Sequence, residues 1–118
     1  MDNGNLRLWR FRKAVILEIY AAEVLTLADI DSVLVELQRT STPPYLIIIV
    51  RTGNYRLSMR AKIRLRKEDR QLFKIAYVVK GLENMRHAES ASRSYLKHKD
   101  VYICDSIESA YNALIRDS

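Results

Sequence analysis

The residues best suited to bind a ligand form one basic segment in the middle of the chain. Eight of the 20 lysine and arginine residues lie between Arg51 and Arg70, where the acids are Glu68 and Asp69 alone. Clustered positive charge of this kind attracts phosphate groups or an acidic protein surface. The side chains that we expect to contact such an anion or partner are Arg51, Asn54, Arg56, Arg60, Arg64 and Lys67.

The same segment has a plainer interpretation, in which it forms a solvated helix face that keeps the protein in solution. Its cations lack interleaved aromatic side chains and match no nucleic-acid-binding signature, so sequence-specific recognition of DNA or RNA is the weaker alternative. Two binding functions therefore stay open. One is association with another protein, and the other is electrostatic binding of nucleic acid through the basic helix expected over residues 56–70.

Residue types that bind metals or carry out catalysis are present but not combined. His87 and His98 stand eleven residues apart without cysteines or paired carboxylates at ligand spacing, so we expect no metal site. Cys104 lies in an apolar run and should be an inert, buried thiol. Residues 51–54 contain one glycine and are not followed by the lysine-serine or lysine-threonine pair of a phosphate-binding loop. No nucleophile, base and orienting group combine, so we expect a protein that is not an enzyme and uses no cofactor.

Length and composition indicate one compact domain over residues 1–118, with residues 1–5 disordered. A chain of 118 residues that is 48% hydrophobic can bury a core without disulfides. A single cysteine is consistent with a reducing compartment. The longest apolar run is too short to span a bilayer, and the first residues lack the pattern of a signal peptide, so we expect a cytoplasmic protein.

The elements that must position the basic segment begin with two strands, over residues 6–11 and 14–20, that we expect to form a hairpin. Leucine and isoleucine residues of the two strands then meet on one face, and Arg7 meets Glu18 on the other. The expected register pairs Phe11 with Ala14, Leu8 with Leu17, Leu6 with Ile19 and Arg7 with Glu18.

The second face of this hairpin holds Arg7 and Glu18, which we expect to form a cross-strand ion pair. The rest of that face is too rich in aromatic and aliphatic area to be left in water. A second copy of the chain would cover it, so a homodimer is predicted. The predicted dimer face consists of Trp9, Phe11, Ile16 and Tyr20.

A helix and a buried strand follow the hairpin. Thr26, with Asp29 three residues later, is typical of a helix start, and the apolar spacing that follows predicts a helix to about Arg39. Two prolines then end the helix. The next segment, residues 45–50, is apolar throughout, and a strand that is apolar on both faces belongs in the middle of a covered sheet. We expect it to be the central strand.

The second helix, which carries the basic residues, is expected to start between Tyr55 and Ser58. Leu57, Ala61 and Leu65 would form its buried line. The remaining expected elements are a strand over residues 73–79, a helix over 83–95, a strand over 101–104 and a last helix introduced by an acidic capping box of Asp105 and Glu108.

The resulting order, ββαβαβαβα, predicts an α/β protein with a single mixed sheet of about five strands. This order, with the basic helix after the central strand and the ending VYICDSIESAY over residues 101–111, resembles the STAS-like superfamily. These small domains are similar to anti-sigma-factor antagonists and include bacterial proteins of unassigned role. The likeness spans about residues 6–115. It implies a sheet whose first strand is antiparallel to the rest, and a partner-binding role in bacterial regulation without catalysis.

The resemblance also directs attention to Ser58. In signalling members of the superfamily an Asp-Ser-Ser-Gly-like stretch precedes the second helix, and a partner kinase phosphorylates one of its serines. Here the corresponding stretch is Leu-Ser-Met-Arg over residues 57–60, so Ser58 is the candidate phosphoacceptor, while the acidic residue and the glycine are missing. A phosphate there would lie near a helix N-terminus between Arg56 and Arg60. The alternative is that Ser58 simply caps the helix.

Overall fold

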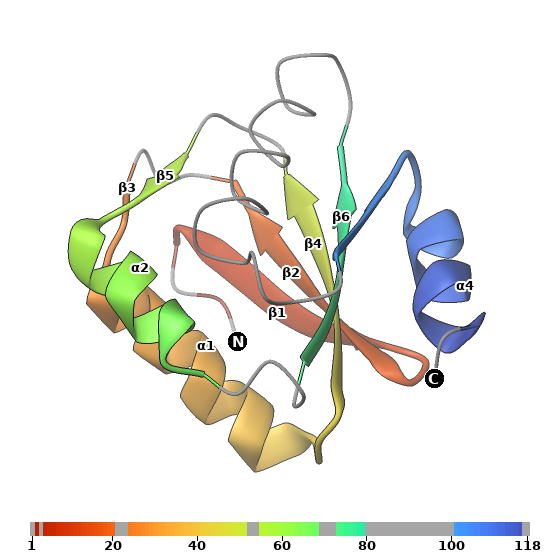
Figure 1. Cartoon of the computed structure of the whole chain (residues 1–118), viewed down its shortest axis with the longest axis horizontal. Helices are drawn as coiled ribbons and strands as arrows, with labels where there is room; N and C mark the ends of the chain where they lie inside the picture. Colours follow the sequence, from red (N-terminus) through yellow and green to blue (C-terminus); the bar gives the residue numbers. More distant parts are fainter. Residues whose placement is uncertain are drawn as a thin grey trace.

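The described part of the structure, a computed structural model, consists of residues 2, 4–20, 24–51, 55–68, 73–79 and 101–116. Within it, a sheet lies between helices on both faces (Figure 1). Helices α1 (Leu27–Thr40) and α2 (Met59–Arg66) lie on one face, and helix α4 (Ile107–Arg116) covers the other. The helix predicted over residues 83–95 lies outside the described residues.

The main sheet contains the strands β1 (Leu6–Phe11), β2 (Ala14–Ile19), β4 (Tyr45–Arg51), β6 (Phe73–Val78) and β7 (Val101–Cys104). Their spatial order is β1-β2-β4-β6-β7. Strand β1 is antiparallel to β2, and all other neighbours are parallel. The predicted five-stranded mixed sheet with an antiparallel first strand is therefore confirmed.

Two short strands outside this sheet were not predicted. Strand β3 (Val24–Leu25) pairs in parallel with β5 (Arg56–Leu57). Two residues are too few for a pattern of alternating burial to be visible in a sequence. The pair lies just before α1 and α2, so it holds the N-terminal ends of the two helices side by side.

The hairpin of β1 and β2 has the predicted register, with Phe11 paired to Ala14. Its turn holds Arg12 at φ 55°, in the left-handed region that residues other than glycine seldom adopt. The Arg12 guanidinium lies 5.1 Å from the ring centroid of Phe11 and 5.3 Å from that of Tyr111. These cation–π contacts offset part of the cost of the turn, which lacks the glycine that such turns prefer.

Strand β1 forms one edge of the sheet and carries charge along it. Arg7 pairs opposite Glu18 as predicted, but its guanidinium lies 4.7 Å from the centroid of the Trp9 ring, so its partner differs from the predicted ion pair. Asp2 makes an isolated antiparallel bridge with Arg7. Because Arg7 already pairs with β2 on one side, this bridge lies on the outer side of β1.

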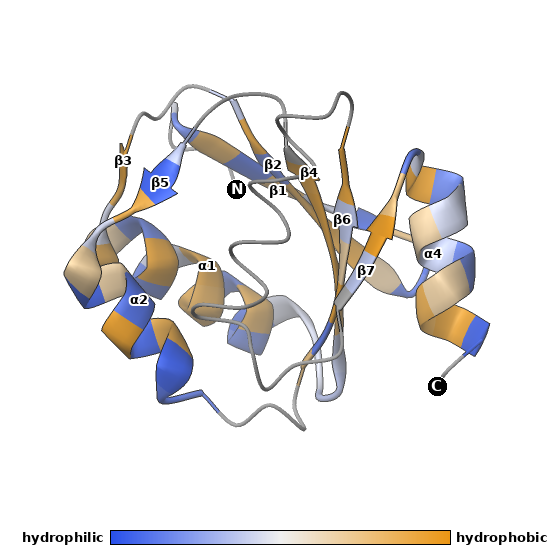
Figure 2. Ribbon diagram, turned by 45° about the horizontal axis from the view of Figure 1, so that its top comes forward, coloured by the Kyte–Doolittle hydropathy of each residue, from blue (hydrophilic) through white to orange (hydrophobic). Residues whose placement is uncertain are grey.

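Strand β4 occupies the centre of the sheet, between β2 and β6. Ile47 and Ile49 belong to the core beneath α1 and α2, whereas Ile48, which is 0% exposed, belongs to the core beneath α4. The apolar residues of these strands are orange in Figure 2. The prediction that residues 45–50 form a central strand covered on both faces is confirmed.

Helix α1 begins and ends where its sequence indicates. Thr26 is the N-cap: its hydroxyl oxygen accepts a hydrogen bond from the Asp29 backbone N–H, and the Asp29 carboxylate accepts one from the Thr26 backbone N–H. This reciprocal pair satisfies two donors that the helix leaves free at its start. The helix ends at Thr40, one residue beyond the predicted end at Arg39.

Helix α4 is capped one position later than predicted. The Ser106 hydroxyl oxygen accepts a hydrogen bond from the Ser109 backbone N–H (3.1 Å), so Ser106 caps the helix. The predicted capping box of Asp105 and Glu108 is therefore wrong. Aspartate and serine are comparable caps, and two adjacent candidates leave the first residue of a helix ambiguous in the sequence.

Candidate functional site

Ser58 lies at the junction of β5 and α2. Its backbone N–H donates to the Leu25 carbonyl (2.9 Å), and its hydroxyl oxygen accepts from the Ala61 backbone N–H (3.1 Å). Ser58 is thus the N-cap of α2, the structural alternative that its sequence left open. Leu57, expected on the buried line of the helix, belongs to β5, although its side chain is buried.

Replacing Ser58 with alanine is expected to lower the free energy of unfolding by about 1 kcal/mol, because the Ala61 N–H loses its acceptor. Ser32 is a matched control, since its hydroxyl donates to the Ala28 carbonyl within α1 and caps nothing. Ser32→Ala should change the stability by less than about 0.5 kcal/mol. Urea unfolding followed by circular dichroism measures both variants, and equal losses would contradict the capping role.

The solvent side of α2 combines apolar and cationic side chains. Met59 is 69% exposed and Ile63 is 44% exposed, and their i, i+4 spacing makes them neighbours on the helix surface. They lie opposite Ala61, which is buried. Three of the cations around them, Arg60, Arg66 and Lys67, are also exposed. We call this surface the α2 outer face and define it as Met59, Arg60, Ile63, Arg66 and Lys67.

Met59 and Ile63, the apolar pair in this face, were not among the contact residues predicted from the sequence, because that prediction was based on charge. The signal was nevertheless present. Residues four apart on a helix share a face, and Met59 and Ile63 stand on the side opposite the expected buried line of Ala61 and Leu65. An apolar pair on the wrong side of an otherwise basic helix indicates a contact surface.

Arg64 connects α2 to α1. Its Nε lies 3.3 Å from the Asp31 Oδ1 on α1, and its guanidinium also pairs with Glu68. Arg64 was expected to contact a partner or anion, but in the structure its charge is balanced within the chain. The pair with Asp31 fixes how α2 sits on α1, and therefore how the α2 outer face is presented.

The other predicted contact residues are spread along β4, β5 and α2. Arg56 in β5 is exposed, as are Arg60 and Lys67. Arg51 is the last residue of β4, and Asn54 lies outside the described residues. The structure thus brings Arg56 to the start of the helix that carries Arg60 and Lys67.

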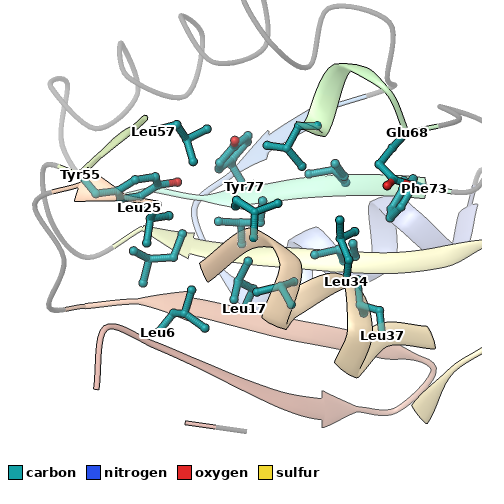
Figure 3. Close-up of a pocket in the computed structure, with 17 residues that line it drawn as sticks. Leu6, Leu17, Leu25, Leu34, Leu37, Tyr55, Leu57, Glu68, Phe73 and Tyr77 are labelled. Atoms are coloured by element: carbon teal, nitrogen blue, oxygen red, sulfur yellow. The ribbon is translucent and has the colours of Figure 1, made fainter. Parts of the chain in front are cut away.

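An apolar cavity of about 80 Å³ lies between the sheet and helices α1 and α2 (Figure 3). Among its described lining residues, Glu68 has the single charged side chain, and it pairs with Arg64. The aromatic residues that Figure 3 labels in its wall include Tyr55 and Tyr77, both buried. Leucine, isoleucine and valine make up most of the rest. These walls bring together no nucleophile and base for a reaction.

Cys104 is half-buried and packs against the core beneath α4. Burial raises the pKa of its thiol, because the thiolate is poorly solvated there, and the charge of Asp105 raises it further. This environment favours the unreactive thiol. In the described part of the chain, no three side chains of histidine, cysteine, aspartate or glutamate gather as metal ligands would. His87 and His98 lie outside it.

The predicted dimer face is partly covered by the chain itself. Ile16 is 1% exposed beneath α4, so the expectation that it lies on an open face is wrong. Phe11 and Trp9 are half-buried, and the Phe11 ring packs edge-on against Tyr111 of α4 with centroids 5.5 Å apart. This cover depends on how α4 returns to the sheet, which the hairpin sequence does not encode. Tyr20 remains 42% exposed.

Tyr20 is held by the start of the chain. Its hydroxyl donates to the Asp2 carboxylate, which also accepts from the Gly4 backbone N–H. The shared hydrogen bond lowers the pKa of Asp2 and raises the pKa of Tyr20 from their ordinary values, because it favours the charged carboxylate and the neutral phenol. Tyr20 therefore has a partner within its own chain.

None of the helices that the structure describes is long and apolar enough to cross a membrane. No family model matches the sequence, and no curated protein matches it.

The fold itself has a counterpart among solved structures. The chain is similar to the crystal structure of an uncharacterised protein of the DUF3478 family from Shewanella loihica PV-4, described as having a SpoIIAA-like fold. The TM-score is 0.62 at 16% sequence identity, over 92% of this chain and 91% of that chain. The protein therefore has a SpoIIAA-like fold, which is the STAS-like fold, as its sequence implied.

Proposed function

We propose that this protein is a non-enzymatic regulatory module that acts by binding another protein through the α2 outer face and Arg56. The observation that supports the proposal is the exposure of Met59 and Ile63, side by side among cations. The STAS-like fold is consistent with such a role, because the superfamily resemblance implies partner binding without catalysis.

The chemistry of this surface suggests the chemistry of its partner. Protein interfaces commonly have an apolar centre and a polar rim, and exposed apolar pairs are the parts that gain most from burial. Here Met59 and Ile63 would form the centre, and Arg56, Arg60 and Lys67 the rim. A basic rim selects an acidic partner and speeds its approach. We therefore expect a protein segment with apolar side chains flanked by aspartate or glutamate.

The competing function is electrostatic binding of nucleic acid through the basic helix over residues 56–70. Its support is the net charge of +6 and the density of exposed cations on α2. A phosphate backbone, however, is contacted by polar and charged groups, so binding to it would not explain why the apolar side chains of Met59 and Ile63 are exposed. Binding driven by phosphate contacts also weakens steeply with salt, which gives the two functions different signatures.

A site-specific photo-crosslinker tests the proposal. Placed at Ile63 in the native host, it should give a discrete adduct that is absent with the crosslinker at Val35, which is 62% exposed on α1. The purified adduct protein should then bind the wild-type chain, and Met59→Asp/Ile63→Asp should weaken that binding by about tenfold or more. Val35→Asp should change it by less than about twofold.

Two outcomes would contradict this function. One is an equal loss of partner binding with the α2 variant and with Val35→Asp. The other is tight binding of duplex DNA or single-stranded RNA near physiological salt that Arg60→Glu/Lys67→Glu abolishes, which would support the nucleic-acid function instead.

Three further parts of the proposal concern modification, assembly and location. Phosphorylation of Ser58 would put negative charge at the start of α2, between the exposed Arg56 and Arg60, and would alter the rim of the proposed interface.

Homodimerisation through Trp9, Phe11 and Tyr20 is a separate expectation, which a strictly monomeric mass at high concentration would contradict. A cytoplasmic location completes the proposal.

A further inference from the structure

A second basic cluster lies at the end of the sheet away from β5 and the start of α2. It lines a cleft of about 490 Å³. Arg10 comes from the end of β1, Arg12 and Lys13 from the hairpin turn, and Arg39 from the end of α1. These residues meet because β2 and β4 are parallel, which brings the start of β2 beside the start of β4 and the loop that follows α1.

Neutral groups hold two of these arginines in place. The Arg10 guanidinium donates to the Thr40 carbonyl (2.7 Å) and to the Ser41 hydroxyl oxygen (3.0 Å). The Arg12 guanidinium lies over the rings of Phe11 and Tyr111. Because its partners carry no charge and line the cleft, Arg10 keeps its full positive charge for a ligand there. Arg12 is also uncompensated, but the rings that it contacts pack beneath α4 and do not line the cleft, so its side chain would have to turn to reach a ligand.

The charge balance of the cleft is strongly positive. Arg39 pairs with Glu36 on the same helix, which offsets its charge, although Glu36 does not line the cleft. The uncompensated charge of the cleft therefore comes from Arg10, Arg12 and Lys13. In the part of the chain that the structure describes, no carboxylate lines the cleft, and Arg10, Arg12 and Lys13 form no ion pair. The Arg10 guanidinium donates to the Thr40 carbonyl at the end of α1. Its positive charge offsets part of the negative end of the helix dipole, which by itself would repel an anion.

Guanidinium groups that are fixed before binding suit phosphate, because their N–H donors match two phosphate oxygens at once. Several cations in one concave site suit a ligand with adjacent phosphates. The volume of the cleft lies in the range of small-molecule sites and exceeds what a diphosphate alone fills. A long nucleic acid needs an extended track of charge instead.

We infer that this cleft, formed by Arg10, Arg12, Lys13 and Arg39, binds the diphosphate group of a small molecule. The site lies apart from the α2 outer face, so it does not depend on the proposed protein-binding function. Either inorganic pyrophosphate or a nucleoside diphosphate could supply the group.

Isothermal titration calorimetry of the full chain with inorganic pyrophosphate and with a nucleoside diphosphate, near physiological salt, tests the inference. Lys13→Glu/Arg39→Glu should weaken binding by about tenfold or more, because both side chains line the cleft and are exposed. Arg60→Glu/Lys67→Glu makes the same change in net charge on α2 and should alter binding by less than about twofold. Arg10→Gln, a milder second variant, should also weaken binding.

Equal affinity for the two ligands would show that the diphosphate group alone is recognised, and tighter nucleotide binding would show that the organic part contributes. Both results support the inference. Unchanged circular dichroism spectra establish that the variants fold. The inference is overturned if the wild-type chain binds neither ligand, or if the charge reversal on α2 weakens binding as much as the reversal in the cleft.

Discussion

Replacing Ile48 with alanine is expected to lower the free energy of unfolding by about 2 to 5 kcal/mol. Ile48 is 0% exposed in the central strand, and it packs in the core between the sheet and α4. Removing its outer carbons loses their transfer free energy and leaves a cavity that strands on both sides prevent from closing. Urea unfolding followed by circular dichroism measures the loss as a shift in midpoint at constant slope.

Two controls separate this packing effect from a general sensitivity to substitution. Ile48→Val keeps most of the volume and should cost about 0.5 to 1.5 kcal/mol. Val35 is 62% exposed on α1, so Val35→Ala should change the stability by less than about 0.5 kcal/mol. A loss below about 1 kcal/mol for Ile48→Ala would mean that the central strand is not packed as described.

The second large effect is expected for Leu114→Ala, again about 2 to 5 kcal/mol. Leu114 is 0% exposed and lies with Ala110 and Tyr111 on the side of α4 that faces the sheet. Helix α4 covers Ile16 and Ile48, so loosening it should also expose apolar surface. Chemical denaturation measures the stability, and binding of a hydrophobic dye measures the exposed surface.

Asn112 is the matched control for this prediction, because it is exposed on the opposite side of the same helix. Asn112→Ala should leave both the stability and dye binding nearly unchanged, within about 0.5 kcal/mol. A Leu114→Ala variant as stable as Asn112→Ala would be inconsistent with α4 as the cover of this sheet face.

Much of the fold could be predicted because its signals are local. The start of α1 is encoded by Thr26 and Asp29, which satisfy each other's hydrogen bonds wherever the helix packs. The run over residues 45–50 is apolar on both faces, and such a strand is stable where both of its faces are covered from water. The register of the hairpin follows from the alternation of its leucines with charged residues.

The predictions that were wrong have a common physical cause, because tertiary contacts decide between alternatives that the sequence alone leaves open. Asp105 and Ser106 are both good caps, and the sequence cannot say which one the helix uses. Arg7 could reach Glu18 or Trp9, and the structure places it over the ring. The cover of Ile16 by α4 depends on a helix more than ninety residues away in the chain.

The two candidate sites differ in how far the sequence reveals them. The basic surface of α2 is visible as a run of charge, although the balancing of Arg64 by Asp31 on another helix is not. The diphosphate cleft leaves no such run, because β2, β3 and most of α1 lie between Arg12 and Arg39 in the sequence. Only the parallel pairing of β2 with β4 brings them together.

The edge strand β1 bears on how copies of this protein meet in a crowded solution. An unpaired strand edge is a template on which another chain can add a strand and begin an aggregate. Here the bridge between Asp2 and Arg7 occupies part of that template, and the exposed Arg7 and Arg10 place like charges along it. Growth of one continuous sheet through several copies is therefore disfavoured along β1, and any self-association would use side chains on the faces of the sheet or its helices.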